Sequence, residues 1–418
     1  MDAKKPRGTR DFSFAEMEDR KHVEETLSGV FECFGYRRIL TPTFEHVELF
    51  AQKSGEEITE HMYVFEDKGG RKICLRPEAT ASVCRMFSEE MRDMRLPLRL
   101  YYFCPMFRYE RPQKGRYREF WQLGLELLGA KNAEADAEVI LLAYDSLKKL
   151  GLLFELEVGH VGVLRGLMND LGIKADVQDK ATAAIDKGDR DALMYLTESA
   201  VLLELVDLKG SSDVIPKAEK LLGEYKTAAV ALAELKNILS WLDLVAVPYK
   251  VNLGIARGLE YYTGMVFEMR VPALAAQNQI CGGGRYDKLI ELFSGLSVPA
   301  VGFAFGFDRV MNAAEHQKIE IPKKRIDVVV APVNEEVRKD AFRIAAGLRG
   351  TLSVDLDVMG RKLPKILDYA GDVKARYALI IGPADLKEGK ATLRNMDDGS
   401  QEIVGLKELK ARLKELCR

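Results

Sequence analysis

The fold is decided by residues 108–129, which have the sequence RYERPQKGRYREFWQLGLELLG. An apolar run precedes them at 98–107, and apolar residues alternate with others toward the end of the stretch. This pattern predicts a strand, a basic loop and a second strand, joined as a hairpin. The loop offers cations for a polyphosphate, and Phe120 and Trp121 offer an aromatic face for a base. A solvated basic loop would have the same composition, so this stretch alone leaves both interpretations open.

Length and composition predict an ordinary globular protein of two or three domains. The chain has 418 residues, of which 47% are hydrophobic and 30% charged, and its net charge is −2. A nucleic-acid-binding surface would therefore have to be local. The six cysteines include no CxxC pair, which argues against a disulfide framework or a structural zinc site. No apolar run is long enough to span a membrane and no signal peptide is evident, so we expect a cytoplasmic location and no membrane partner.

The first hundred residues predict a long helix followed by short strands. Apolar spacing predicts a helix over 15–34 that stops at Gly35. The next segment, 36–45, is extended and contains Pro42, which favours the edge of a sheet because proline has no N–H for a strand partner. An edge strand beside a long helix is a suitable surface for pairing with a second copy of the chain.

Residues 63–81 predict a hairpin that leads into a helix. Two alternating apolar runs flank DKGG (67–70), a suitable turn sequence. Glu78 and Thr80 then stand at the junction between the second strand and the helix. A carboxylate and a hydroxyl at that position could bind an ammonium group, or they could cap the helix.

The middle of the chain changes character. A helix is predicted over 132–150 and a strand over 153–160. From about 165 to 245, Leu, Ala, Lys and Glu dominate and no strand pattern is evident, which predicts a helical insertion between strand-rich segments.

Strand signals return after the insertion. They occur over 249–271 and again over 298–311, where the strand leads into a helix carrying Asp308 and Arg309. Between them, 280–290 contains three consecutive glycines and predicts a turn before a helix. Glycine amides in such a turn could bind phosphate, although tight turns need glycine for other reasons as well.

The last ninety residues predict a separate α/β domain with a mainly parallel sheet. Residues 321–325 are predicted to be the linker, and a turn is predicted at 395–401 before a closing amphipathic helix. The β-α-β-α-β alternation comes from strands at 326–333, 352–358 and 376–382, with helices at about 335–349 and 360–372.

The candidate chemistry rests on arginines. The sequence has no GxxxxGK[ST] phosphate loop, no metal-binding triad and no nucleophile-elbow serine. The five histidines lie outside the segments above, so a histidine base is not favoured. Arg108, Arg257 and Arg309 are always cationic and bidentate, which suits a polyphosphate whose charge must be stabilised during reaction.

These segments together resemble the histidyl-tRNA synthetase family, which belongs to the class II aminoacyl-tRNA synthetases. Residues 34–45, 108–122 and 302–310 resemble the three class II motifs, and Asp308 stands where motif 3 often has glutamate. The resemblance extends over nearly the whole chain. Its further parts are two histidine-specific motifs at 257–268 and 281–290, the segment 75–81, and the anticodon-binding segment 360–382.

The resemblance implies an α+β class II catalytic domain built on an antiparallel sheet at 1–325, with the helical insertion at about 170–245. A C-terminal α/β anticodon-binding domain would follow at 326–418. The implied activity is that of a ligase, which activates L-histidine with ATP to histidyl-adenylate and pyrophosphate and then transfers histidine to the 3′ end of tRNA(His). The family also implies ATP with Mg²⁺, a homodimer, and contact of the insertion with the tRNA acceptor arm.

Site roles follow from the resemblance, residue by residue. Arg257 and Arg108 would be catalytic, acting on the α-phosphate, and no residue would bind a metal. The roles of Arg111, Lys114 and Arg118 are left open between contact with tRNA and solvation. Histidine would be bound by Glu78, Ala79, Thr80, Arg108, Gln122, Glu126, Arg257, Tyr261 and Tyr262, with Glu126 and Tyr262 at the imidazole. ATP would be bound by Arg108, Glu110, Arg116, Phe120 and Arg309.

Two alternatives belong to a different functional class. One is the regulatory subunit of ATP phosphoribosyltransferase, a noncatalytic paralogue that lacks the anticodon domain. The other is a synthetase-like sensor that binds uncharged tRNA without catalysis. The C-terminal domain and the intact histidine-specific motifs weigh against the first, and the intact Arg108, Arg257 and Arg309 weigh against the second.

Overall fold

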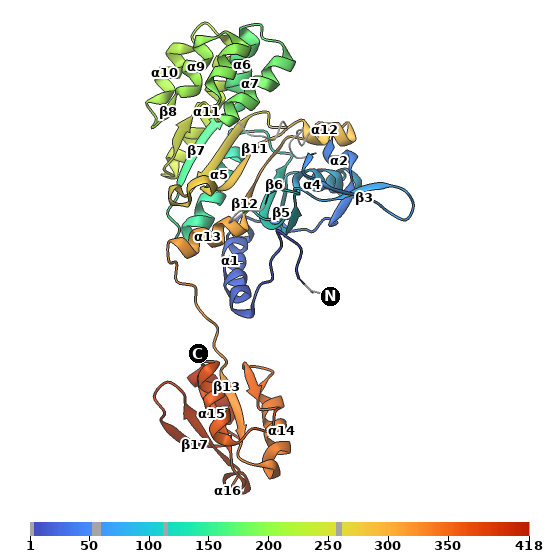
Figure 1. Ribbon diagram of the computed structural model, residues 1–418. Coiled ribbons are helices and arrows are strands. Elements are labelled where there is room, and N and C mark those ends of the chain that lie inside the picture. Colours follow the sequence, from blue (N-terminus) through green and yellow to red (C-terminus); the bar gives the residue numbers. More distant parts are fainter. Residues whose placement is uncertain (1–3, 52–59, 112–115, 256–260, 418) are drawn as a thin grey trace. The chain divides into compact units, whose positions relative to one another are not determined.

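The computed structural model of the chain describes residues 4–51, 60–111, 116–255 and 261–417 (Figure 1). The chain divides into two compact units, Met1–Ile321 and Pro322–Arg418, and the division falls in the predicted linker. Within the described residues, no helix combines the length and apolar character that a membrane span needs.

The first unit is built on a nine-stranded sheet. All pairings from β5 to β7 are antiparallel, whereas β1 joins β5 and β9 joins β7 in parallel. The predicted antiparallel sheet is therefore confirmed. In sheet order the strands are β1 (Arg37–Arg38), β5 (Leu98–Phe107), β6 (Glu119–Leu128), β12 (Ala300–Gly306), β11 (Gln279–Arg285), β10 (Met265–Arg270), β7 (Glu155–His160), β9 (Lys250–Asn252) and β8 (Lys209–Gly210).

Strands β5 and β6 form the hairpin that is predicted for residues 98–129. Gln122 of β6 lies opposite Cys104 of β5, and Glu126 lies opposite Leu100. On its other side β6 pairs with β12, where Glu126 lies opposite Gly302. Side chains alternate between the faces of a strand, so Gln122 and Glu126 share one face of the sheet.

The N-terminal elements also follow the sequence pattern. Helix α1 (Phe14–Cys33) begins at a capping box formed by Ser13 and Glu16. The extended segment after it forms the edge strand β1, as predicted. A second sheet has the order β2 (Phe44–His46), β4 (Lys72–Leu75) and β3 (Tyr63–Glu66), which confirms the predicted hairpin. The short helices are α2 (Glu48–Ala51), α4 (Thr80–Met86) and the π-helix η1 (Phe87–Met91).

The predicted helical region contains one short strand. Residues 209–210 form β8 and pair with β9, and two residues are too few to give an alternating pattern. Helix α5 (Ala133–Lys149) lies before this region and packs against the sheet. The other described elements of the region are helices. They are α6 (Val161–Asp170), α7 (Ala175–Lys187), α8 (Arg190–Thr197), α9 (Ala200–Asp207), α10 (Val214–Leu221) and α11 (Lys226–Leu244).

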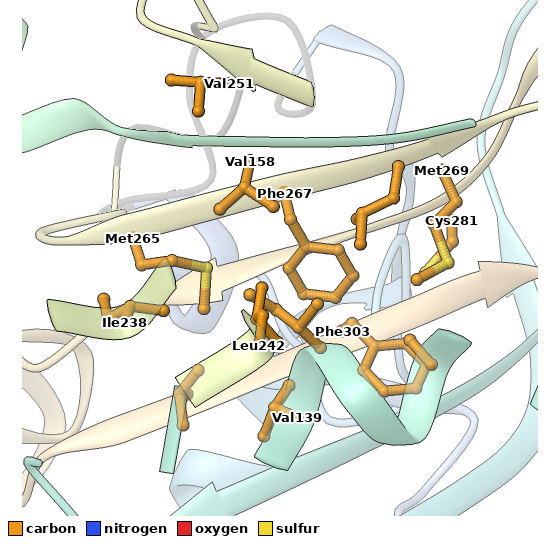
Figure 2. Close-up of a cluster of buried hydrophobic side chains, with 14 of the residues drawn as sticks. Val139, Val158, Ile238, Leu242, Val251, Met265, Phe267, Met269, Cys281 and Phe303 are labelled. Carbon is orange, nitrogen blue, oxygen red and sulfur yellow. The ribbon is translucent and has the colours of Figure 1, made fainter. Parts of the chain in front are cut away.

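The last of these helices packs into the main core. Ile238 and Leu242 of α11 lie with Val139 of α5 against Phe267 and Phe303 of the sheet (Figure 2). These side chains are at most 3% exposed. The helical region is therefore joined to the sheet by a continuous apolar core, and not only by its chain ends.

The three consecutive glycines form the middle of a strand, so the prediction of a glycine-rich turn is wrong, whereas the helix predicted after it is present as α12 (Leu289–Ser294). Residues 282–284 of β11 pair with both β10 and β12, so their amides are not arranged for phosphate. A Cβ on Gly284 would lie 2.5 Å from the carbonyl oxygen of Met265 and 2.8 Å from the ring of Tyr262. The glycines are there because neighbouring groups approach the strand closely.

The second unit has its own five-stranded sheet, with the order β14 (Val354–Leu356), β13 (Val328–Pro332), β15 (Tyr377–Ile381), β16 (Lys390–Asn395) and β17 (Gln401–Gly405). The first two pairings in this order are parallel and the last two antiparallel, so the sheet is mixed and not mainly parallel. The predicted turn at 395–401 joins β16 to β17, a hairpin that the sequence analysis missed. The helices include α14 (Arg338–Leu348), α15 (Leu363–Asp372), α16 (Pro383–Lys387) and α17 (Leu409–Leu416).

Candidate active site

A cavity of about 340 Å³ lies in the first unit and gathers most of the predicted site residues. Strands β5, β6, β11 and β12 contribute to its wall, together with α4 and α13 (Phe307–His316). Ala79 is buried at the N-cap of α4 and is not part of the lining, and Arg257 lies outside the described residues. The predicted residues that line the cavity are Glu78, Thr80, Arg108, Glu110, Arg116, Phe120, Gln122, Glu126, Tyr261, Tyr262 and Arg309.

Glu126 lies at the centre of a buried polar network. Its side chain receives hydrogen bonds from the hydroxyls of Thr80 at 2.9 Å, Tyr102 at 3.4 Å and Tyr286. Burial raises the pKa of Glu126 to about 8, and the hydrogen bonds from Tyr286 and Thr80 oppose that rise. The carboxyl group therefore accepts several donors in a place where its charge is poorly solvated.

Gly302 makes room for this carboxyl group. It stands opposite Glu126 on β12, and a Cβ there would lie 2.0 Å from Glu126 Oε2 and 2.3 Å from the carbonyl oxygen of Leu125. A side chain at this position would displace the carboxylate or the strand. The glycine in β12 thus allows the network to form on the face of the sheet.

Of Glu78 and Thr80, only Glu78 has the capping role that the sequence left open. Glu78 accepts hydrogen bonds from the backbone N–H groups of Thr80 at 2.6 Å and Ala81 at 3.1 Å, so it satisfies the start of α4. Burial raises the pKa of Glu78, whereas those two bonds and the charge of Arg108 lower it. The Thr80 hydroxyl, meanwhile, is bound to Glu126. Capping is therefore performed by Glu78 and not by Thr80.

Three arginines line another part of the cavity. Arg309 donates from Nη1 to the carbonyl oxygen of Gln279 at 2.9 Å, and Arg108 donates from Nε to that of Pro77 at 2.9 Å. The pKa of Arg309 is lowered by burial and by the charges of Arg116 and Arg108. These cations repel one another, and a bound polyanion would relieve that repulsion.

The aromatic and acidic neighbours of the arginines complete this region. The guanidinium of Arg108 lies 5.3 Å from the ring centroid of Phe120. Arg116 forms an ion pair with Glu110, so two side chains predicted to contact different parts of ATP contact each other here. We call Glu78, Thr80, Tyr102, Glu126 and Tyr286 the carboxylate end of the cavity, and Arg108, Arg116, Phe120 and Arg309 the arginine end.

Sequence reasoning missed several lining residues. Tyr286 directly follows β11. Because the glycines were interpreted as a turn, there was no reason in the sequence to place the side chain of Tyr286 in the cavity. Tyr102 lies in an apolar run, where a tyrosine gives no sign of polar function. His61 also lines the cavity, although it lies outside the sequence segments that were singled out.

The open question about three basic residues is partly answered. Arg118 is half-buried and donates from Nε to the carbonyl oxygen of Glu110 at 3.2 Å, so it is not merely solvated. Arg111 is exposed, and Lys114 lies outside the described residues. Among the residues that the structure describes, no group of three or more His, Cys, Asp or Glu side chains is placed to hold a metal ion.

Comparisons with known proteins match family models to both units of the chain. The family model described as histidyl-tRNA synthetase matches residues 8–310, and the model described as anticodon binding domain matches residues 327–416.

Individual relatives match over nearly their full length. A histidine–tRNA ligase of Methanocaldococcus jannaschii is 46% identical over 414 residues, which cover 97% of this chain and 98% of the relative. One from Archaeoglobus fulgidus is 46% identical over 98% of this chain and 99% of the relative. The crystal structure of apo S. aureus histidyl-tRNA synthetase has a TM-score of 0.80 at 27% identity, and covers 98% of this chain and 99% of that one. The chain therefore belongs to the histidyl-tRNA synthetase family.

Proposed function

We propose that this cavity is where the chain activates L-histidine with ATP, before it transfers histidine to the 3′ end of tRNA(His). The observation that carries the proposal is the pairing of two chemically different ends in one cavity. A buried carboxyl group with hydroxyl neighbours suits a small polar side chain, and a group of arginines suits a polyphosphate. An ordinary solvated basic loop would have no such carboxylate end.

The carboxylate end would recognise the imidazole. A neutral imidazole has one donor and one acceptor nitrogen, and Glu126 with the phenol of Tyr262 supplies partners for both. Tyr261 and Tyr262 are 6% and 8% exposed and line the same wall. A buried polar site of this kind rejects apolar amino acids of similar shape, because they would leave its polar groups unpaired. Glu78, Thr80 and Gln122 would bind the α-ammonium group.

The arginine end would promote formation of the adenylate. An oxygen of the histidine carboxylate attacks the α-phosphorus, a new P–O bond forms, and the bond to the leaving pyrophosphate breaks. Arg108 would stabilise the charge on the α-phosphate, while Arg309 and Arg116 bind the outer phosphates. Triphosphate would then replace Glu110 as the partner of Arg116.

Three further assignments rest on the resemblance. Arg257, outside the described residues, would be the second catalytic arginine at the α-phosphate. Phe120 would stack on the adenine and Glu110 would accept a hydrogen bond from its amino group. We treat Mg²⁺ as part of the ATP substrate.

Transfer to tRNA would involve the other parts of the chain. The second unit, which matches the anticodon-binding family, would contact unpaired anticodon bases. The helical region at about 170–245 would contact the acceptor arm. In domain terms, residues 1–325 would form the catalytic domain and 326–418 the anticodon-binding domain.

We also propose that the chain forms a homodimer in the cytoplasm. Support for the dimer comes from the edge strand β1 and from the neighbouring α1, whose first turn exposes Phe14 by 85% and Met17 by 47%. Exposed apolar side chains beside an unpaired strand edge suit an interface between copies.

The decisive experiment is an aminoacylation assay with labelled histidine and total tRNA. The proposal predicts histidine-dependent charging. Binding of tRNA without charging would favour the sensor alternative, and absence of both would favour the noncatalytic paralogue. The comparisons give neither alternative any support over the enzyme.

A further inference from the structure

We propose that Arg10 is a positioning residue for ATP, because it connects the hairpin loop to helix α13 outside the cavity. Arg10 contacts Tyr117 and Asp308, and these residues are the chain neighbours of Arg116 and Arg309. The inference rests on the proposed function, since it takes the arginine end to be the phosphate site. It assigns a task to the N-terminal segment, which we define as residues 6–12.

The N-terminal segment lies along the base of the hairpin loop. The carbonyl oxygen of Gly8 accepts a hydrogen bond from the backbone N–H of Arg118 at 2.9 Å, and that of Arg7 accepts one from Arg118 Nη1 at 3.5 Å. Gly8 has a φ of +87°, and a Cβ there would lie 2.7 Å from Arg118 Cγ. The segment therefore fits closely against the returning side of the loop, where glycine is needed for both conformation and space.

Arg10 has partners on both sides of the arginine end. Its guanidinium carbon lies 3.6 Å from the ring centroid of Tyr117, and its Nη2 donates to Asp308 Oδ1 at 2.6 Å. Tyr117 and Asp308 both line the cavity. A planar guanidinium can stack on a ring and donate in its own plane at the same time, which a lysine ammonium cannot do.

Asp308 accepts hydrogen bonds from three parts of the chain, namely the N-terminal segment, α1 and β6. Its Oδ1 also accepts from Arg20 of α1 at 2.7 Å, and its Oδ2 accepts from the backbone N–H of Trp121 in β6 at 2.8 Å. The Asp308 side chain is 4% exposed, whereas that of Arg10 is 27% exposed. Loss of Arg10 would leave Asp308 with Arg20 and the Trp121 amide, so the buried carboxylate would not become an unpaired charge.

These contacts give Arg10 a specific expected effect. Without it, Tyr117 loses its stacking partner and the loop end that carries Arg116 is less firmly held relative to Arg309. Two arginines that must bind the same triphosphate would then spend less time at the required separation. Contacts at the carboxylate end include none from the N-terminal segment among the described residues, so the affinity for histidine should change little.

The test compares Arg10→Ala and Arg10→Lys with Arg7→Ala, which removes a charge from an exposed side chain of the same segment. ATP–pyrophosphate exchange gives KM values for ATP and histidine, and calorimetry gives the Kd for ATP–Mg²⁺. We expect Arg10→Ala to weaken ATP binding about 3- to 30-fold with the KM for histidine within about twofold, and Arg10→Lys to restore only part of the loss. Arg7→Ala should resemble the unchanged protein.

Three outcomes would overturn the inference. They are an unchanged Kd for ATP with Arg10→Ala, an equal loss for both substrates accompanied by a lower Tm, and full rescue by lysine. A protein that binds ATP but supports no histidine-dependent exchange would contradict the proposed function instead, and the calorimetric comparison of the variants would still decide the role of Arg10.

Discussion

The two ends of the cavity are built in opposite ways. At the carboxylate end, Glu126 sits within a central strand, where the register of β5, β6 and β12 fixes its neighbours. At the arginine end, the cations stand where elements end or begin. Arg108 follows β5, Arg116 lies in the loop between β5 and β6, and Arg309 is in the first turn of α13.

The difference is also electrostatic. Hydroxyl donors surround a carboxyl group whose pKa is raised by burial, so that end is satisfied within the protein. The arginine end instead gathers like charges that lower the pKa of Arg309. Sheet register can therefore build a selective pocket, while the phosphate site depends on holding mutually repelling cations in place. Preorganisation of this kind is what stabilises charge during reaction.

The largest expected effect comes from removing a cation at the arginine end. Arg309→Ala should lower kcat/KM for ATP in pyrophosphate exchange by about 10²–10³-fold, because a preorganised charge at the phosphates is lost. Arg111→Ala serves as the control, since its side chain is exposed and outside the lining. An exchange rate for Arg309→Ala close to that of the control would sink the phosphate assignment.

Neutralising the carboxylate end should affect the other substrate. Glu126→Gln keeps the shape of the side chain but removes its ability to ionise and to accept hydrogen bonds at both atoms, and we expect kcat/KM for histidine to fall about 10- to 100-fold. The KM for ATP should stay nearly constant. Glu119→Gln makes the same change on the same strand outside the cavity lining and should have little effect. If the Glu126 variant changed only the ATP parameters, the division of the cavity would be wrong.

A glycine at the carboxylate end should be costly to replace. Gly302→Ala places a Cβ 2.0 Å from Glu126 Oε2 and should lower the free energy of unfolding by about 1–3 kcal/mol. Gly306→Ala on the same strand is the matched control, since the nearest atom to its Cβ is Arg309 Cδ at 3.4 Å. Denaturant unfolding of both variants measures the difference. Equal free energies of unfolding for the two variants would contradict the close approach of Glu126 to Gly302.

The last expected signal, which is small at any single pH step, is a dependence of stability on pH. Burial raises the pKa of Glu126 from its ordinary value of 4.5 to about 8. The folded state therefore binds this proton more tightly than the unfolded state, and its contribution to stability is present at low pH and lost as pH rises toward 8. Between pH 5 and 8 the unchanged protein should lose up to about 1 kcal/mol per pH unit more than Glu126→Gln. Parallel stability curves would contradict the raised pKa.

Local patterns were enough to predict the hairpin of β5 and β6, because alternation on both sides of a basic loop is a strong signal. The same reasoning failed where long-range pairing decides the structure. The glycines of β11 have weak strand propensity, and only pairing with β10 and β12 makes them a strand. Strand β8 was missed for a similar reason, since it has two residues and pairs with the distant β9. The hairpin of β16 and β17 is local, and it was missed because only its turn was identified.

The site was predicted mainly through the resemblance, and the structure brings most of those residues to one cavity. Residues that reach the site by contacting side chains far away in the sequence have no local sequence pattern that marks them. Tyr286 reaches Glu126 from 160 positions away, and Arg10 reaches Asp308 from 298 positions away. No pattern within a short window of sequence can indicate such contacts, because they exist only after the sheet has formed.

The central claim is that the two ends bind different substrates, and it is tested most directly by calorimetry of histidine and of ATP–Mg²⁺ separately. The titrations compare the unchanged protein with Glu126→Gln and Arg309→Ala. We predict a crossed result, in which Glu126→Gln weakens only histidine binding and Arg309→Ala weakens only ATP binding. Loss of both ligands in both variants, or of the opposite ligand in either, would contradict the account.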